Sequence, residues 1–263
     1  MIQKYKDWLS INGCAEKTIL NYIHRIKKFL KKVKLEDINE ENINKFFIEL
    51  KRQYSPSTIN GYKQTIKSFL KFLKKDINLP KNERIEETIP ETIDEKFFKN
   101  NIIPVAECIF SNSIKVKAIL YFMFYTGLRV GEIGNIKREH IDLENRTAKI
   151  IKRKNKKSLI IFFSKEVKNI IENYFKLEAE QENAFNIKTE SIQSMFKKLK
   201  KHIKEINLHP HLFRHSFAVM TLKRGADIKR VGQLLGHKQL RTTERYAQLK
   251  NEDLQRSYDE WYK

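Results

Sequence analysis

Residues 209–218 read His-Pro-His-Leu-Phe-Arg-His-Ser-Phe-Ala, and this stretch indicates both the fold and the chemistry of the chain. A second tract, Leu-Gly-His at 235–237, follows it, and Tyr246 lies nine residues after His237. Histidine and arginine side chains hydrogen-bond phosphate oxygens, and arginine keeps its charge at any physiological pH. A tyrosine oxygen can attack phosphorus and retain the energy of the broken bond in an ester. Together these groups indicate covalent chemistry on a nucleic-acid backbone.

The charge of the chain also points to a nucleic acid. The chain has 263 residues, with 53 Lys and Arg against 32 Asp and Glu, and a net charge of +21. Residues 1–80 and residues 81–263 each carry excess positive charge, which a single basic tail would not produce. Compositional drift toward Lys is the alternative explanation, and the many Ile and Asn residues support part of it. Drift should add Glu as well as Lys, so we expect a polyphosphate partner.

Cysteine usage and hydropathy exclude several other classes of protein. Cys14 and Cys108 are the two cysteines, so neither a disulfide framework nor a zinc CxxC pattern is present. The first ten residues do not form a signal peptide, and the sequence has no apolar run of 18 residues. We therefore expect a cytoplasmic protein with no membrane partner.

Residues 1–78 show the apolar periodicity of helices. The dipeptide Ser55-Pro56 is a helix start, with an N-cap serine and proline at the first helical position. The spacing predicts about four helices with a basic exterior. Residues 79–94 contain two prolines and mixed charges without a sustained apolar face, which is typical of an extended linker.

Residues 95–263 read as a second, larger domain that is mostly helical. The apolar stretch 114–125 predicts a buried helix that ends at Thr126-Gly127. Two apolar runs within 146–163 flank a basic tract and predict a β-hairpin. The fold class we expect is mainly α, with an N-terminal helical bundle and a small antiparallel β-sheet in the larger domain.

Three motifs in this larger domain resemble those of one family. Residues 126–132 (Thr-Gly-Leu-Arg-Val-Gly-Glu) resemble the first arginine motif of the tyrosine recombinases, also called the phage integrase family, which includes the Xer resolvases. Residues 209–218 resemble the His-x-x-Arg motif of that family. Residues 234–237, followed by Thr-Thr-Glu-Arg-Tyr at 242–246, resemble its last motif. Their order and spacing also match, and the resemblance covers about residues 95–250.

The resemblance assigns roles to individual residues. Arg129 and Arg214 would hold the scissile phosphate. Tyr246 would attack it, giving a 3′-phosphotyrosyl link and a free 5′-hydroxyl. His211 and His237 would hydrogen-bond the phosphate. Glu132 would be a supporting carboxylate near the active site.

The family's general acid is a lysine at the tip of a β-hairpin. Alignment on the end of the second strand places this lysine at Lys154, and a shift of one or two residues moves it to Lys152 or Lys156. Another register would place Arg153 there, but an arginine with a pKa above 12 is a poor proton donor. We therefore assign the role to Lys154. The resemblance implies no cofactor and no metal.

The four histidines near these motifs have a competing interpretation as a metal cluster. His209 and His211 flank Pro210, but no Cys, Asp or Glu joins the histidines at a familiar metal-ligand spacing. We expect no metal site. His215 and Ser216 are interpreted as core or supporting groups.

The resemblance also implies an architecture and a reaction. Residues 1–78 would be a core-binding, SAM-like DNA-binding domain and residues 95–263 the catalytic domain with a C-terminal tail helix. The reaction would be site-specific recombination of double-stranded DNA through a Holliday junction, by a homotetramer assembled on the target site and without ATP. Five apolar residues of the tail would dock on a neighbouring protomer: Leu249, Leu254, Tyr258, Trp261 and Tyr262. The alternative is that they pack on their own domain.

Two other functions fit the same basic composition. One is an architectural DNA-binding protein that never cuts DNA, and the other is a strand relaxer of the type IB topoisomerase kind, which shares the phosphotyrosine. The complete set of reactive side chains favours a recombinase. The sequence does not specify the target site, the biological task or an accessory protein.

Overall fold

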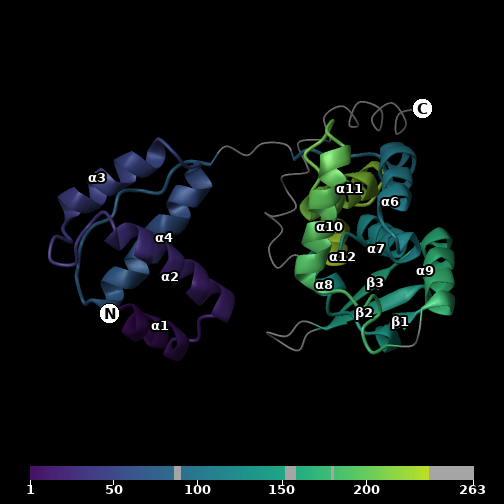
Figure 1. The fold of residues 1–263 in the computed structure, drawn as a ribbon, viewed down its shortest axis with the longest axis horizontal. Helices are drawn as coiled ribbons and strands as arrows, with labels where there is room; N and C mark the ends of the chain where they lie inside the picture. The colour runs from purple at the N-terminus through teal and green to yellow at the C-terminus, as the bar shows by residue number, and fades with distance from the viewer. Residues whose placement is uncertain (86–89, 152–157, 179–180, 237–263) are drawn as a thin grey trace. The chain divides into compact units, whose positions relative to one another are not determined.

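The computed structural model describes residues 1–85, 90–151, 158–178 and 181–236. The chain divides into two compact units, Met1–Glu87 and Thr88–Lys263. Within the described ranges the fold is mainly helical, with one three-stranded antiparallel sheet (Figure 1). The predicted fold class is therefore confirmed.

The first unit contains four helices, as the apolar periodicity predicts: α1 (Ile2–Ile11), α2 (Glu16–Leu30), α3 (Glu40–Lys51) and α4 (Pro56–Phe72). Their apolar faces meet in a core that includes Tyr5, Ile26, Phe29, Phe47 and Phe69, all at most 2% exposed. Ser55 is the extended N-cap of α4 with Pro56 at its first position, as expected.

The stretch expected as a linker contains residues that pack on each unit. The Lys63 side chain on α4 is 3% exposed, and its Nζ donates to Glu83 Oε1 at 2.6 Å. The Asn60 side chain donates to the Glu83 carbonyl at 2.9 Å and accepts from the Glu83 amide at 2.7 Å. Ile93, at the other end, is buried in the second unit. The division between the units falls between these two contacts.

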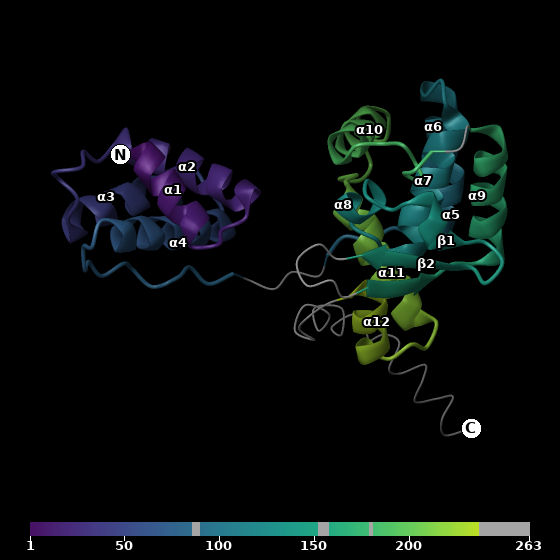
Figure 2. The same ribbon diagram turned by 90° about the horizontal axis from the view of Figure 1, so that it is seen from below.

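The second unit is built around one buried helix. Its elements in chain order are α5 (Glu95–Phe97), the π-helical turn η1 (Phe98–Ile102), α6 (Ile103–Ile109), α7 (Ser113–Thr126), α8 (Val130–Ile133), the 3-10 turn η2 (Arg138–His140), β1 (Ile141–Asp142), β2 (Thr147–Ile151), β3 (Ser158–Phe162), α9 (Lys165–Leu177), α10 (Thr189–His202), α11 (Pro210–Lys223) and α12 (Ile228–Leu235). Residues 118–124 of α7 are all buried, since α7 is apolar on every side. Figures 1 and 2 show α7 between α9 and α10.

The predicted hairpin at 146–163 is present. Strands β2 and β3 pair antiparallel, with Ala148 opposite Ile161 and Lys149 opposite Ile160. Short strand β1, which the sequence pattern did not predict, pairs with β2 and completes the sheet in the order β1-β2-β3. The hairpin tip, residues 152–157, lies outside the described residues.

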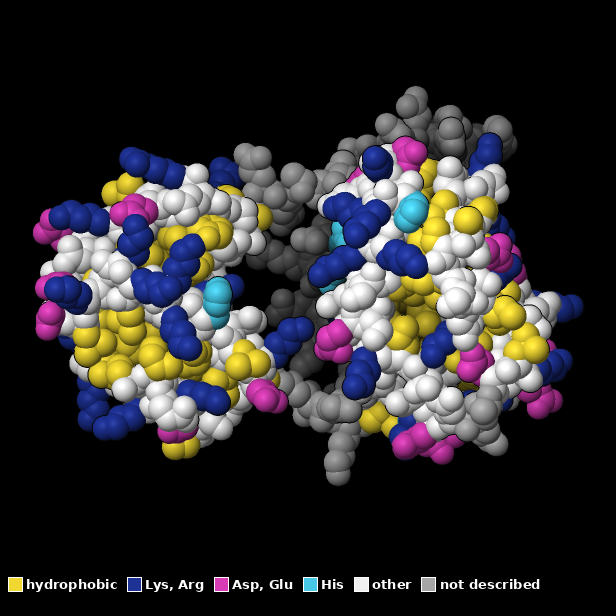
Figure 3. Space-filling view, in the orientation of Figure 1, with side chains coloured by type: hydrophobic (Ala, Val, Ile, Leu, Met, Phe, Trp, Pro, Cys, Tyr) yellow, Lys and Arg dark blue, Asp and Glu magenta, His cyan; other side chains and the backbone are white. Residues whose placement is uncertain are grey.

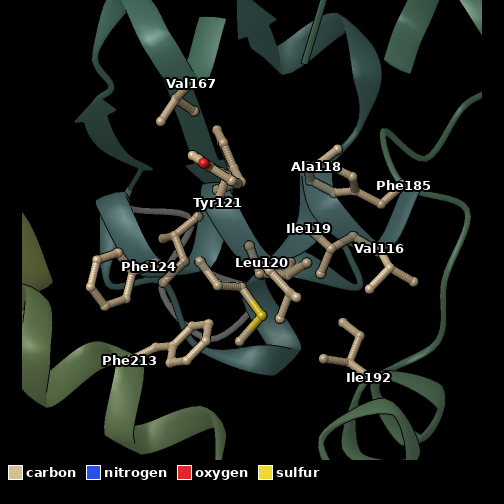
Figure 4. Packing of buried hydrophobic residues seen from close by; sticks show 14 of the residues in the cluster. Val116, Ala118, Ile119, Leu120, Tyr121, Phe124, Val167, Phe185, Ile192 and Phe213 are labelled. Carbon is tan, nitrogen blue, oxygen red and sulfur yellow. The ribbon is translucent and has the colours of Figure 1, made fainter. Parts of the chain in front are cut away.

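Aromatic rings join α11 to α7. Figure 4 shows Phe213 of α11 beside Phe124 of α7, and their ring centroids are 5.4 Å apart in an edge-to-face arrangement. Phe98 stacks on Phe124 at 4.1 Å and meets Phe213 at 5.5 Å. Because edge and stacked aromatic pairs add to the gain from burial, this cluster fixes α11 on the central helix.

The surface of each unit is rich in basic side chains. In the face shown in Figure 3, Lys and Arg side chains are spread over both units, and in the second unit several lie beside histidine side chains. No helix in the described part of the chain is long and apolar enough to cross a membrane.

Candidate active site

The start of α11 places two of the expected site residues. Pro210 occupies the first helical position and His209 the N-cap, in an extended conformation with φ −155° and ψ 160°. A proline restricts the preceding residue to extended backbone, so the His-Pro pair itself defines where α11 begins. His211 then lies in the first turn on an exposed position, and Arg214 lies one turn later, facing the interior.

Arg214 is held by the carboxyl ends of two other helices. Its side chain is 5% exposed. Nη1 donates to the Gly127 carbonyl at the end of α7 at 2.7 Å, and Nη2 donates to the Leu235 carbonyl at the end of α12 at 2.8 Å. The last carbonyls of a helix lack helical partners and carry partial negative charge, so they compensate a buried cation. These contacts set the plane of the Arg214 guanidinium.

Gly127 is the point where α7, α11 and α12 meet. It ends α7 in the left-handed region, with φ +64°. A Cβ at this position would lie 2.6 Å from Phe217 Cδ1 and 2.8 Å from Leu235 Cδ2. Glycine is therefore required both by the backbone angle and by the close approach of two side chains.

Replacing Gly127 by alanine is expected to lower the free energy of unfolding of the second unit by about 1–3 kcal/mol, through left-handed strain and the two clashes. The measurement is chemical denaturation followed by near-UV circular dichroism. Gly225→Ala is the matched control, because Gly225 has φ +91° but a Cβ added there would meet nothing within 4 Å. If both variants lose the same free energy of unfolding, backbone strain alone, and not the clash with Phe217 and Leu235, would explain why residue 127 is glycine.

Arg129 is oriented by Glu132. Arg129 is the N-cap of α8, and its backbone amide donates to Glu132 Oε2 at 2.8 Å. Its guanidinium Nη1 donates to Glu132 Oε1 at 2.9 Å. The Arg129 side chain remains 40% exposed while that of Glu132 is 15% exposed. The Glu132 carboxylate thus accepts from both the backbone amide and the guanidinium of Arg129, and the guanidinium remains accessible to a ligand from solvent.

The positive charges of Arg129 and Arg214 both act on the imidazole of His211. Although His211 is exposed to solvent on one side, its pKa is lowered first by partial desolvation and then by the positive charges of His209, Arg214 and Arg129. Arg214 also donates to the carbonyl of Gly127, two residues before Arg129, so the fold brings the first arginine motif and the His-x-x-Arg motif together. A neutral imidazole can donate through one ring nitrogen and accept through the other. Two guanidinium groups and a neutral histidine together form a site for a phosphate or another oxyanion.

Ser216 anchors α11 behind the site. Its hydroxyl accepts from the Ile93 amide at 2.9 Å and donates to the Leu212 carbonyl at 2.8 Å, so this serine supports the helix from the interior. His215 lies with its ring centroid 6.4 Å from that of His211. In the described part of the chain, no group of three or more His, Cys, Asp or Glu residues could hold a metal ion.

Three expected site residues lie outside the described residues: Lys154, His237 and Tyr246, together with the alternatives Lys152, Arg153 and Lys156. Gly127 ends α7, as the sequence predicted, but sequence reasoning missed the carbonyls of Gly127 and Leu235 as partners of Arg214. Backbone carbonyls have no residue-type signal. Sequence reasoning also missed the N-cap role of His209, although a position just before a proline signals an N-cap, as it does for Ser55.

Comparison with known proteins agrees with the motifs. The model described as "Phage integrase family" matches residues 98–253. A protein named tyrosine recombinase XerA, from Saccharolobus solfataricus, is 31% identical over 267 residues, which cover 95% of this chain and 88% of that protein.

Two solved structures share the fold at low sequence identity. A lambda integrase dimer bound to a COC′ core site has a TM-score of 0.75 at 16% identity, covering 93% of this chain and 75% of the other. The XerH site-specific recombinase bound to a palindromic difH substrate has a TM-score of 0.70 at 16% identity, covering 92% of this chain and 78% of the other. The fold described above is therefore shared with an integrase bound to a core site and with a site-specific recombinase bound to its substrate.

Proposed function

Because this chain belongs to the phage integrase family, we propose that it is a site-specific DNA recombinase that cuts and rejoins DNA through a 3′-phosphotyrosine intermediate. The observation that carries the proposal is the convergence of Arg129, Arg214 and His211 on one site in the second unit. XerA and XerH, described above, are named as recombinases, and XerH is seen bound to its substrate.

The two arginines would bind the non-bridging oxygens of the scissile phosphate. Arg214 is rigid, since two helix ends hold it, and Arg129 is oriented by Glu132 while half exposed. As an attacking oxygen adds to phosphorus, negative charge grows on these oxygens. Preoriented guanidinium groups stabilise that charge without reorganising during the step.

The covalent step would use residues outside the described ranges. The Tyr246 oxygen forms a bond to phosphorus as the bond between phosphorus and the 5′ oxygen breaks. The departing 5′ oxygen takes a proton from the Lys154 ammonium and leaves as a hydroxyl. His211 and His237 hydrogen-bond the phosphate, and His211, whose pKa is lowered, is neutral near pH 7 and able to take the tyrosine proton.

Reversal of this step on a second strand would exchange strands without ATP, because the phosphotyrosyl ester keeps the energy of the cut bond. Four protomers would hold two target sites, exchange one pair of strands into a Holliday junction and then resolve it. The C-terminal tail would dock on the neighbouring protomer. The basic surface would supply most of the affinity through phosphate contacts, so binding should weaken steeply with salt. We also propose that the protein acts in the cytoplasm.

The test is to trap the covalent intermediate. Randomly fragmented duplex DNA is incubated with the protein, denatured adducts are isolated, and the attached DNA is sequenced to recover the cleaved site. A substrate nicked beside that site then accumulates the adduct, and mass spectrometry of the digested protein is expected to find the nucleotide on Tyr246. Absence of any adduct would favour an architectural DNA-binding protein. An adduct that leads to relaxed circles without recombinant product would favour a topoisomerase.

A further inference from the structure

The N-cap of α11 is an unusual one. The Leu212 backbone amide donates to two acceptors of the same residue, the His209 Nδ1 at 3.1 Å and the His209 carbonyl oxygen at 3.0 Å. Serine, threonine, aspartate and asparagine are the usual side chains in this role, and each keeps its acceptor at neutral and mildly acidic pH. An imidazole accepts at Nδ1 only when it is neutral and carries its proton on Nε2.

We propose that His209 is a positioning residue for strand cleavage: its neutral imidazole caps α11 and thereby fixes the first turn of the helix, which carries His211. This inference rests on the proposed function. His209 itself is not assigned a contact with DNA.

The rest of α11 is anchored without the cap. Phe213 packs among Phe98 and Phe124, Arg214 is held by two carbonyls, and Ser216 binds the Ile93 amide. These side chains lie at residue 213 and beyond, and the Ser216 hydroxyl also donates to the Leu212 carbonyl at 2.8 Å. At the start of the turn from Pro210 to Leu212, the Leu212 amide donates to both the carbonyl oxygen and the Nδ1 of His209, and the Leu212 side chain is buried. Loss of the Nδ1 acceptor would therefore weaken the turn that carries His211, while Arg214 keeps its place.

Protonation of His209 would remove the cap. The imidazolium would present a second N–H toward the Leu212 amide, and it would place a positive charge at the positive end of the helix dipole. Two charged groups act on the pKa of His209: Glu91 before α5 raises it, whereas Lys200 on α10 lowers it. The neighbouring His211 has its own pKa lowered by the charge of His209. Burial has the largest effect and lowers the pKa of His209, so the cap is intact at neutral pH.

The stability of the folded protein depends on pH through His209 and His211. His209 and His211 both have a lowered pKa in the folded protein, so the unfolded chain binds protons first as the pH falls below about 6.5. Their contribution to stability is complete above that pH and is lost as the pH falls through the folded-state pKa. An asparagine at position 209 keeps a capping oxygen and removes one of the two titrations.

The experiment compares His209→Ala and His209→Asn with the wild-type chain in single-turnover cleavage at saturating nicked substrate, from pH 5.5 to 8. At pH 7.5 the alanine variant is expected to cleave about tenfold more slowly, the rate equivalent of a lost N-cap. Its affinity for DNA should be unchanged. The asparagine variant should cleave within about threefold of wild type, and its rate relative to wild type should rise as the pH falls.

Ser164→Ala is the matched control, because it removes the side-chain cap of α9, where the Ser164 hydroxyl accepts from the Val167 amide at 3.3 Å. This variant should keep the wild-type rate and pH profile. An asparagine variant as slow as the alanine variant, or a constant ratio of asparagine to wild-type rates across the pH range, would overturn the role of His209. If the wild-type chain itself forms no adduct, the proposed function fails, which is a separate outcome.

Discussion

Replacing Tyr246 by phenylalanine is expected to abolish the covalent protein–DNA adduct completely. Phenylalanine keeps the ring but lacks the oxygen that would bond to phosphorus, so no other change in the site can restore the ester. Binding should be unaffected, because DNA affinity would come mainly from the basic surface. The measurement is denaturing electrophoresis of protein incubated with the nicked substrate, together with a gel-shift titration of the intact site.

Tyr258→Phe is the control for this prediction, since Tyr258 is a second phenol in the same C-terminal segment. It should form the adduct at the wild-type level. Adduct formation that survives in Tyr246→Phe and disappears in Tyr258→Phe would mean that the nine-residue interval after His237 assigns the wrong nucleophile.

Substituting lysine for Arg214 is expected to slow single-turnover cleavage by about two to three orders of magnitude, the usual cost of losing one preoriented oxyanion donor. Lysine keeps the positive charge, but its ammonium is a point charge. It cannot match the planar guanidinium that donates to Gly127 and Leu235 at once. The loss should appear in the cleavage rate at saturating DNA, with only a small change in the dissociation constant.

Arg224→Lys controls for the loss of an arginine on the same helix. The Arg224 side chain is 63% exposed and pairs with Glu95 at 2.6 Å, near the end of α11 that is remote from His209. A surface ion pair contributes little, so this variant should cleave at nearly the wild-type rate. Equal slowing in both variants would indicate a general effect on α11 and would remove the special role of Arg214.

Much of the fold follows from local sequence. The four helices of the first unit, the buried helix ending at Gly127 and the hairpin around 146–163 were predicted from periodicity and end signals, because each of these depends on neighbouring residues. Strand β1 was not predicted, since two residues carry no periodicity and their pairing with β2 is a tertiary contact. The stretch 79–94 was expected to be an extended linker, but Glu83 and Ile93 each pack against a different unit, which composition does not reveal.

The sequence by itself determined which residues are candidates for the chemistry, because side-chain type and spacing in three motifs are properties of the chain alone. Only the tertiary structure decided how these candidates are held. The buried guanidinium of Arg214 is oriented by carbonyls at the ends of α7 and α12, which lie 87 and 21 residues away. Every residue has a backbone carbonyl, so no residue type in the sequence marks the two carbonyls that accept hydrogen bonds from Arg214. Which carbonyls meet a given arginine is set by the packing of helices, and that packing exists only once the chain is folded.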